Sequence, residues 1–418
     1  MQRYDTYKPS GVKWLGEIPS HWEVIKSKYL WKESFSISEN GNEELLSVSQ
    51  YDGITPAKGD SRSESLEGYK IVSENDLVIN IMLAWMGGLG VSKYDGIVSP
   101  AYCVYKLTKD SNPKYLHYLY KTPLYLAEFA RHSSGVIPSR WRMYTDDFGQ
   151  VVSLLPPRKE QDAIVGYLDE KMAKIDAAIA QQQKMIDLLN ERKQIIINRA
   201  VTKGLNPNAK MKDSGVEWIG EVPEGWKIIP LKAIISFVNG YAFDSNDFKD
   251  EGEVKVIRIS NIADGTIDYE GIAFVHQNQS LCPYLTKAGD LLIAMSGATT
   301  GKVGFDDLGG AYVNQRVGII RSDFQKWVYY WLNTSYFKEY IYLSALGSAQ
   351  PNISSKGIKN FRILFPSIED YDRIVENLEL LCQKVDNAIG SCKNQISLLQ
   401  ERKQIIINEV VTGKVKVG

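Results

Sequence analysis

Two halves of the chain repeat the same short motifs, and this duplication limits what the chain can fold into. Residues 10–25 read SGVKWLGEIPSHWEVI, and residues 214–229 read SGVEWIGEVPEGWKII. Near the end of each half, residues 188–198 read LLNERKQIIIN and residues 398–408 read LLQERKQIIIN. Internal similarity of this kind indicates that one structural plan is used twice. The ends of the halves are nearly identical while the middles have diverged, which predicts a shared frame with two separate tasks.

Length and composition favour a globular chain with more than one domain. The 418 residues exceed the ~250–300 residues at which single cores stop growing. Hydrophobic residues make up 44% and charged residues 24%, which is ordinary for a soluble protein. Four cysteines without a CxxC motif predict neither a disulfide framework nor a zinc site. We find no apolar run long enough for a membrane span and no secretory signal, so we expect a cytoplasmic protein.

A heptad pattern follows a proline in each half, after Pro156-Pro157 and after Pro366. The steps between apolar residues alternate between four and three, which is typical of a coiled coil. One apolar seam needs another to cover it, so we predict two long helices packed as an antiparallel intrachain coiled coil with a pseudo-two-fold internal repeat. The alternative is that these helices dimerise the chain with a second copy. The seam residues are Leu168, Met172, Ile175, Ile179, Ile186, Leu189 and Ile196 in the first half, and Leu378, Cys382, Val385, Ile389, Cys392, Ile396, Leu399 and Ile406 in the second.

The diverged middles mix short β-like runs with turns, and each continues into an aromatic-rich helical segment, at 115–131 and at 324–343. This pattern predicts an α+β fold class, with two domains of mixed α/β type. The expected domains are residues 1–157 and 205–366, and the expected coiled-coil helices are 158–204 and 367–418.

This order of domains and helices resembles the specificity subunit of type I restriction-modification enzymes. There is one departure: the second helix opens with Asp370-Tyr371 where the first has Glu160-Gln161. This change affects only the local cap of the second helix. The resemblance covers the whole chain. It is carried by the SGVxWxGExPxxW openings at Ser10 and Ser214, the Pro156-Pro157-x-x-Glu160-Gln161 motif, the doubled ERKQIIIN blocks, and the Gly297–Gly304 turn followed by Asn314-Gln315-Arg316.

The resemblance implies a non-catalytic subunit that recognises double-stranded DNA. Residues 1–157 and 205–366 would be target recognition domains, each reading one half of a bipartite asymmetric site, and the coiled coil would set the spacer. Two methyltransferase subunits would dock on the shared regions, and restriction/translocase subunits would join them. S-adenosylmethionine, ATP and Mg would bind to those partner subunits, with no cofactor and no metal on this chain and no role at a membrane.

The residue types and motifs of the sequence agree with a subunit that has no catalytic activity. The histidines are dispersed, and no methyltransferase or nuclease motif is found. The segment Gly297–Val303 is similar to a phosphate loop, but it has three residues between its glycines, and Val303 stands where a Ser or Thr would bind magnesium. We interpret it as a turn in which Lys302 contacts the DNA backbone.

Candidate DNA contacts combine hydrogen-bond donors with expected exposure, because Arg and Lys recognise guanine while Asn and Gln recognise adenine in the major groove. The alternative for each residue is a solvated polar loop, with Trp141 in the core. The candidates of the first domain are Lys58 and Arg62, as phosphate contacts, and Ser139, Arg140, Trp141, Arg142 and Tyr144; those of the second are Lys302, Asn314, Gln315, Arg316, Ser348, Gln350, Asn352 and Lys356.

The charge balance leaves a second function open. The formal net charge is −1, whereas DNA-binding domains usually carry a basic excess. Modest neutralisation of phosphates predicts modest affinity of the chain alone, with partner subunits clamping the duplex. The alternative is a duplicated protein–protein scaffold that does not bind DNA. A fused restriction enzyme with its own chemistry is disfavoured, because its motifs are missing.

Overall fold

The computed structural model describes residues 2–50, 53–57, 65–137, 140–216, 219–344 and 351–417, and the statements below concern these residues. The chain folds into two compact units. Unit 1 contains residues 1–183 and 393–418, and unit 2 contains residues 184–392. Each unit therefore combines one globular α/β part with a part of each of two long helices, α4 (Arg158–Lys203) and α8 (Ile368–Val411).

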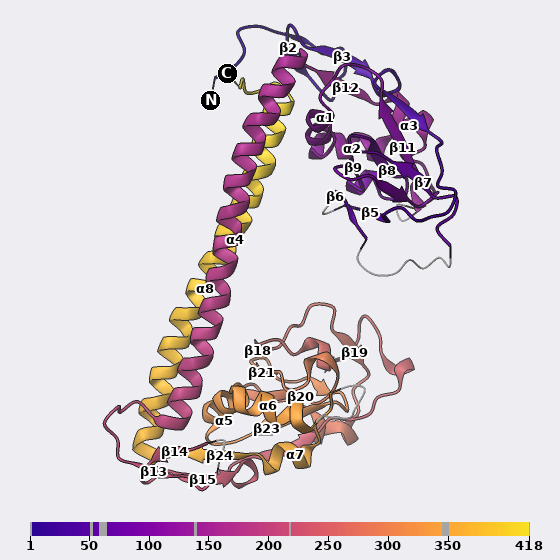
Figure 1. Ribbon diagram of the computed structural model, residues 1–418. Coiled ribbons are helices and arrows are strands. Elements are labelled where there is room, and N and C mark those ends of the chain that lie inside the picture. Colours follow the sequence, from indigo (N-terminus) through magenta and orange to yellow (C-terminus); the bar gives the residue numbers. More distant parts are fainter. Residues whose placement is uncertain are drawn as a thin grey trace. The chain divides into compact units, whose positions relative to one another are not determined.

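The globular part of unit 1 is built around an antiparallel sheet with the strand order β4-β11-β8-β9 (Figure 1). Shorter pairs surround this sheet, and three helices complete the domain. The sheet strands are β4 (Trp31–Ser34), β11 (Tyr102–Leu107), β8 (Leu77–Asn80) and β9 (Leu89–Val91); the pairs are β1 (Tyr7–Pro9) with β2 (Glu17–Pro19), β3 (Glu23–Lys26) with β12 (Val152–Leu155), β5 (Leu46–Ser49) with β6 (Gly53–Pro56), and β7 (Lys70–Val72) with β10 (Gly96–Val98); the helices are α1 (Pro113–Tyr120), α2 (Pro123–Arg131) and α3 (Thr145–Gln150).

Unit 2 repeats this plan with additions. Its main sheet has the order β16-β23-β20-β21-β18, in which only the last pairing is parallel. The sheet strands are β16 (Ser236–Asn239), β23 (Val317–Arg321), β20 (Asp290–Ala294), β21 (Val303–Asp306) and β18 (Gly265–Thr266); a second sheet contains β19 (Ala273–Val275), β17 (Val254–Ile257) and β22 (Tyr312–Val313); the pairs are β13 (Met211–Asp213) with β14 (Glu221–Pro223) and β15 (Lys227–Pro230) with β24 (Arg362–Phe365); the helices are α5 (Gln325–Leu332), α6 (Ser335–Ser344) and α7 (Ser355–Asn360).

Each aromatic-rich helical segment consists of two helices, α1 and α2 in unit 1 and α5 and α6 in unit 2. A threonine divides each segment: the Thr122 hydroxyl accepts the N–H of Tyr125, and the Thr334 hydroxyl accepts the N–H of Phe337. A threonine that caps a new helix in this way satisfies an N–H that would otherwise lack a partner. The aromatic side chains of these helices fill both cores, and Trp327 and Trp331 are fully buried.

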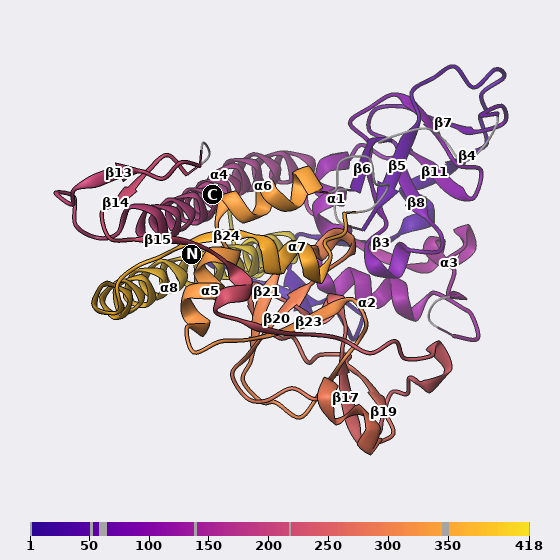
Figure 2. The same ribbon diagram turned by 90° about the horizontal axis from the view of Figure 1, so that it is seen from below.

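The coiled coil expected from the heptads is present, and it is antiparallel and internal to the chain. Helices α4 and α8 lie side by side in both views (Figures 1 and 2). The seam is covered, since Leu168 and Leu378 have no exposed surface and Ile186 and Ile406 expose only 6% each. The predicted α+β fold class with a pseudo-two-fold internal repeat is therefore confirmed.

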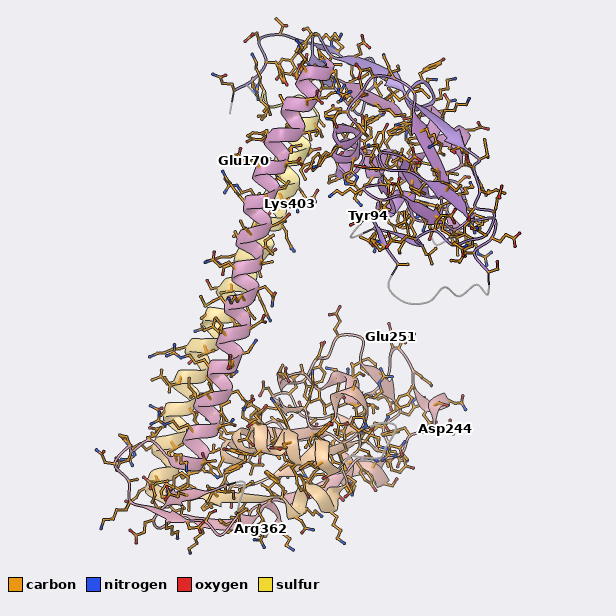
Figure 3. The ribbon with its side chains drawn as sticks, in the orientation of Figure 1. Tyr94, Glu170, Asp244, Glu251, Arg362 and Lys403 are labelled. Carbon is orange, nitrogen blue, oxygen red and sulfur yellow. The ribbon has the colours of Figure 1, made fainter. Side chains whose placement is uncertain are left out.

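Equivalent ion pairs stabilise the same register in both units. In unit 2, Lys193 Nζ lies 2.7 Å from Asp386 Oδ1, and in unit 1, Lys403 Nζ lies 2.6 Å from Asp176 Oδ1. Figure 3 labels Lys403 on α8. The two pairs correspond residue by residue under the offset that relates the two ERKQIIIN blocks. The lysines occupy weak seam positions of the heptad pattern, where an ion pair replaces an apolar contact.

The start of each long helix is anchored by a tryptophan from the repeated opening motif. The indole N–H of Trp22 donates to Glu160 Oε1 at 3.1 Å, and that of Trp226 approaches Asp370 Oδ2 at 3.5 Å. The departure Asp370-Tyr371 therefore keeps the carboxylate and changes its neighbour.

The neighbouring residues stabilise the two helix starts differently. The buried Gln161 side chain accepts hydrogen bonds from Ser111 Oγ and the Asn112 N–H and donates one to the Pro156 carbonyl. Tyr371 instead packs edge-on against Phe324, with ring centres 5.2 Å apart. A polar cap in unit 1 is thus replaced by aromatic packing in unit 2.

Glycines end both long helices, as the sequence predicts. Gly204 follows α4 with a φ of 70°, and Gly413 follows α8 with a φ of 74°, a conformation that favours glycine. The chain ends meet within unit 1, where Gln2 pairs with Lys416 (Figure 1). No helix in the described part of the chain is long and apolar enough to cross a membrane.

Candidate nucleic-acid interface

Three loops of unit 2 meet at the end of β20. The N–H of Met295 donates to the carbonyl of Arg316 (2.9 Å), and the carbonyl of Met295 accepts the N–H of Ile353 (2.9 Å). Arg316 belongs to the loop between β22 and β23, and Ile353 precedes α7. Residues 296–302 form the turn between β20 and β21. Together these loops form one surface at the end of the main sheet, which we call the unit 2 tip.

The unit 2 tip gathers the described candidates of the second domain. Lys302 lies in the turn, Asn352 pairs with Ser296 through a β-bridge, and Lys356 lies on α7. Lys302, Gln315, Arg316, Asn352 and Lys356 are exposed, whereas Asn314 is partly buried and accepts the N–H of Gln315 at 2.7 Å. Ser348 and Gln350 lie outside the described residues.

Unit 1 forms a corresponding surface, the unit 1 tip, from the turn at residues 81–88 and the segments at residues 133–137 and 140–144. The N–H of Met143 donates to the carbonyl of Ile81 at 3.0 Å. Residues 134 and 142 exchange two backbone hydrogen bonds, of 3.0 and 2.9 Å, which hold residues 133–137 beside residues 140–144. Lys58, Arg62 and Ser139 lie outside the described residues.

The described candidates of the first domain lie on this tip but differ in accessibility. Arg140 is exposed, and Arg142 is partly buried and donates from Nη1 to the Arg140 carbonyl at 3.2 Å. Trp141 is partly buried and packs edge-on against Trp85 with ring centres 5.5 Å apart, so its ring supports the tip. Tyr144 is 52% exposed, and its carbonyl accepts the first helical N–H of α3, from Phe148.

The two tips are equivalent positions of one frame. The bond from Met143 to Ile81 in unit 1 corresponds to the bond from Ile353 to Met295 in unit 2. Gly87 and Gly301 close the two turns with φ values of 90° and 87°, which explains why both copies keep a glycine at this place.

An ion pair at the base of each main sheet fixes the strands that lead to the tips. Asp76 pairs with Lys106 in unit 1, with 3.1 Å between Oδ2 and Nζ. Asp290 pairs with Arg321 in unit 2, with 2.7 Å between Oδ1 and Nε. The hydrogen bond to Asp290 raises the pKa of Arg321 above its usual value. Both aspartates are 5% exposed, so these pairs stabilise the sheets and take no part in the tips.

Some residues of the tips were missed by sequence reasoning. Arg258 follows β17, and the Asn314 N–H donates to the neighbouring Ile257 carbonyl at 2.9 Å. The Arg258 guanidinium lies 5.7 Å from the ring centre of Phe248, and its Nε is buried without a hydrogen-bond partner among the described residues. Aligning the turn at residues 81–88 with the Gly297 turn would have found Trp85 as well. Arg258 had no such signal, because only the fold brings it to the tip.

The residues that the structure describes contain no group of three or more His, Cys, Asp or Glu side chains placed to bind a metal ion. His21 contacts Glu160, with 2.8 Å between Nε2 and Oε2, at the start of α4. His117 is held against β9, where its Nδ1 accepts the N–H of Val91 at 3.1 Å. These histidines have structural contacts.

Comparison with known proteins shows which proteins the chain is similar to. Residues 223–396 match the family model described as a type I restriction modification DNA specificity domain. The chain is 26% identical to the type I restriction enzyme MjaVIII specificity subunit of Methanocaldococcus jannaschii, over 96% of this chain and 94% of that protein. It is 23% identical to the EcoBI specificity subunit of Escherichia coli, over 83% of this chain and 75% of that protein.

A solved structure supports the fold. A chain from work on complex assembly and conformational transition of the type I R-M system aligns with a TM-score of 0.69 and 15% identity, over 95% of this chain and 99% of that one. The resemblance stated from the sequence is thereby confirmed: the chain is similar to specificity subunits of type I restriction-modification enzymes over nearly its whole length.

Proposed function

We propose that this chain is the DNA-reading subunit of a type I restriction-modification complex and that it has no catalytic activity itself. Each tip would read one half of a bipartite asymmetric site on double-stranded DNA. The observation that carries the proposal is the equivalence of the tips: one hydrogen-bonded frame presents Arg140 and Arg142 in unit 1 and Arg316 and Asn352 in unit 2. Arginine and amide side chains are those that recognise base edges.

The helices would set the gap between the half-sites. Their length is fixed by the seam, and each residue of helix adds ~1.5 Å. Inserting one heptad into both α4 and α8 preserves the seam and would lengthen the spacer by about 10 Å, or roughly three base pairs at ~3.4 Å each. The two half-sequences should stay the same. Mapping methylated adenines in a strain that carries the insertion tests this, and altered half-sequences would contradict it.

Two methyltransferase subunits would dock on a stripe that the duplication preserves. Leu188 and Ile195 on α4 are 50% and 58% exposed, and their counterparts Leu398 and Ile405 on α8 are 64% and 48% exposed. Packing within the chain does not require identical side chains at exposed positions. Two equivalent binding surfaces for two copies of one partner do require them, since each surface would meet the same contacts.

The stoichiometry of the complex tests this docking surface. Leu188→Glu should leave one methyltransferase subunit bound, and Leu188→Glu with Leu398→Glu should leave none, as measured by native mass spectrometry. Leu380→Glu is the matched control, because Leu380 is 51% exposed on α8 and its counterpart in the repeat is Glu170. Loss of binding in the control, or no loss in the double variant, would refute this docking surface.

The partner subunits would bring S-adenosylmethionine for adenine methylation and ATP with Mg for cleavage, and the complex would act in the cytoplasm. Deleting the gene and sequencing the genome for methylated adenines is the direct test of function. We expect a split asymmetric motif to lose its methylation. If a complex with the methyltransferase forms but shifts no DNA, the chain is a protein–protein scaffold instead.

A further inference from the structure

The unit 1 tip exposes an unusual number of apolar side chains. They come from the turn between β8 and β9 and from the paired segments at residues 133–137 and 140–144. The exposed fractions are 95% for Val136, 48% for Ile137, 38% for Met82, 39% for Met86 and 52% for Tyr144. Single exposed apolar residues need no explanation, but a group on adjoining loops marks a binding surface.

The backbone presents these side chains in fixed positions. The Met82 N–H donates to Asn80 Oδ1 at 3.1 Å, and Lys121 Nζ donates to the Gly87 carbonyl at 2.7 Å, so both ends of the turn are held. The Arg140 N–H donates to the Ile137 carbonyl at 2.9 Å, which ties the two paired segments together. A surface ordered before binding loses less entropy when it meets its ligand.

The equivalent turn of unit 2 is polar. Aligning the two turns by their closing glycines places Ser296 opposite Met82, Thr299 opposite Trp85 and Thr300 opposite Met86. The frame is the same in both units, so folding alone does not require methionines at the exposed positions of unit 1. The difference between the two turns therefore concerns what each of them contacts.

Basic side chains accompany the apolar ones. Arg140 is exposed, and Arg142 donates to the Arg140 carbonyl within the same segment. Apolar side chains flanked by arginines fit an anionic ligand that also offers an apolar group. In the major groove of DNA that group is the C5 methyl of thymine, which no other base of unmodified DNA carries.

We propose that the unit 1 tip recognises thymine methyl groups in its half-site through Val136, Met82 and their apolar neighbours, and that the unit 2 tip reads its half-site by hydrogen bonds. This inference rests on the proposed function and specifies the base chemistry that each tip reads. Arg140 and Arg142 contact phosphates or guanine beside the apolar contact.

The test uses the full chain assembled with its methyltransferase subunits and duplexes that contain the mapped motif. Exchange of residues 1–155 first shows which half-site unit 1 reads. Deoxyuridine, which lacks the C5 methyl, then replaces the thymines of one half at a time. In the unit 1 half we expect affinity to fall by about fourfold for each contacted methyl group. In the unit 2 half we expect no measurable change.

Variants connect this loss to the tip. Val136→Ala and Met82→Ala should bind thymine and deoxyuridine duplexes with similar affinity, because the apolar partner of the methyl group is gone. Ile37→Ala is the matched control, since Ile37 is 55% exposed in the same unit and pairs with Lys70 away from the tip. It should keep the preference for thymine.

Three results would overturn the inference: a unit 1 half-site without thymine, equal sensitivity of both halves to deoxyuridine, or a thymine preference that survives in both tip variants. Each of these leaves the DNA-reading role intact. Failure of the assembled complex to bind any duplex would instead refute the proposed function.

Discussion

Unit 1 and unit 2 use the same hydrogen bonds behind their tips and different side chains on them. The bonds from Met143 to Ile81 and from Ile353 to Met295 hold the same loops, and Gly87 and Gly301 turn the chain in the same way. The exposed positions carry methionines in one unit and hydroxyl groups in the other. The difference teaches that the frame is constrained by packing, while the tips are free to diverge with the ligand.

The largest expected effect comes from exchanging one tip completely. Replacing residues 1–155 with the corresponding domain of a related specificity subunit should change one half of the methylated motif and leave the other half unchanged, because each unit has its own core. Methylation mapping of the chimera measures this. A change in both halves would mean that the tips do not read independently.

The second-largest effect should come from removing the tryptophan anchors, which lowers the free energy of unfolding. Trp22 has no exposed surface and Trp226 is 4% exposed, so substitution of either by Ala should lower the free energy of unfolding by about 3–5 kcal/mol. Denaturant unfolding measures the loss of free energy. Hydrogen exchange in β12 and in β24 shows whether the loss lies in unit 1 or in unit 2.

The phenylalanine variants sharpen the comparison of the two anchors. Trp22→Phe should cost about 1 kcal/mol more than Trp226→Phe, because the indole of Trp22 donates to Glu160 at 3.1 Å whereas that of Trp226 is 3.5 Å from Asp370. Equal losses would show that ring packing alone makes the anchor.

Unit 1 should lose stability in mild acid through His117. Burial lowers the pKa of His117 to about 4, with smaller effects from Lys121, Lys93 and Lys114. Because the folded-state pKa of His117 lies below its unfolded value of about 6.5, the neutral imidazole contributes fully to the free energy of unfolding above that pH. Up to about 3 kcal/mol of this free energy is lost as the pH falls towards 4. Hydrogen exchange in β9 between pH 7 and pH 4 measures this loss.

The control variants for this pH dependence lie in different units. His117→Asn keeps an acceptor for the Val91 N–H without a group that titrates in this range, so it should flatten the pH dependence. His276→Asn alters an exposed histidine of unit 2 and should leave the dependence of β9 unchanged. A profile that is the same with and without His117 would contradict the assignment.

The smallest effect concerns the ion pairs at the seam. Lys193 with Asp386 and Lys403 with Asp176 are partly solvent-exposed pairs, so each should contribute about 0.2–1 kcal/mol. A double-mutant cycle for each pair measures the coupling, which should weaken with salt. Clearly unequal coupling free energies would show that the two ion pairs do not stabilise the helix register equally in the two units.

Sequence periodicity predicted the long-range frame well, because a heptad seam has only a few ways of being covered. The strand expected at residues 102–107 is β11, and the run at 254–259 contains β17. The predicted helices at 158–204 and 367–418 contain α4 and α8. Splitting of the aromatic segments into pairs of helices was missed, although Thr122-Pro123 is a capping signal.

The candidate site was predicted only in part, because its members are far apart in the chain. Arg316 and Asn352 were named from residue type, and the backbone of Met295 brings their loops together. Arg258 was not named, since nothing in its neighbourhood of sequence marks it. Trp141 was considered both as a DNA contact and as core, and its contact with Trp85 gives it a supporting position. The contacts with DNA remain predictions.

The sequence by itself determined that the chain has two copies of one plan and that each copy ends in a seam-bearing helix, because repeats and heptads are local patterns. Only the tertiary structure decided which loops share a tip and that the methionines of one turn are exposed on its surface. Hydrogen bonds between segments separated by tens of residues, such as those of Met143 and Met295, make that arrangement, and no local pattern encodes them.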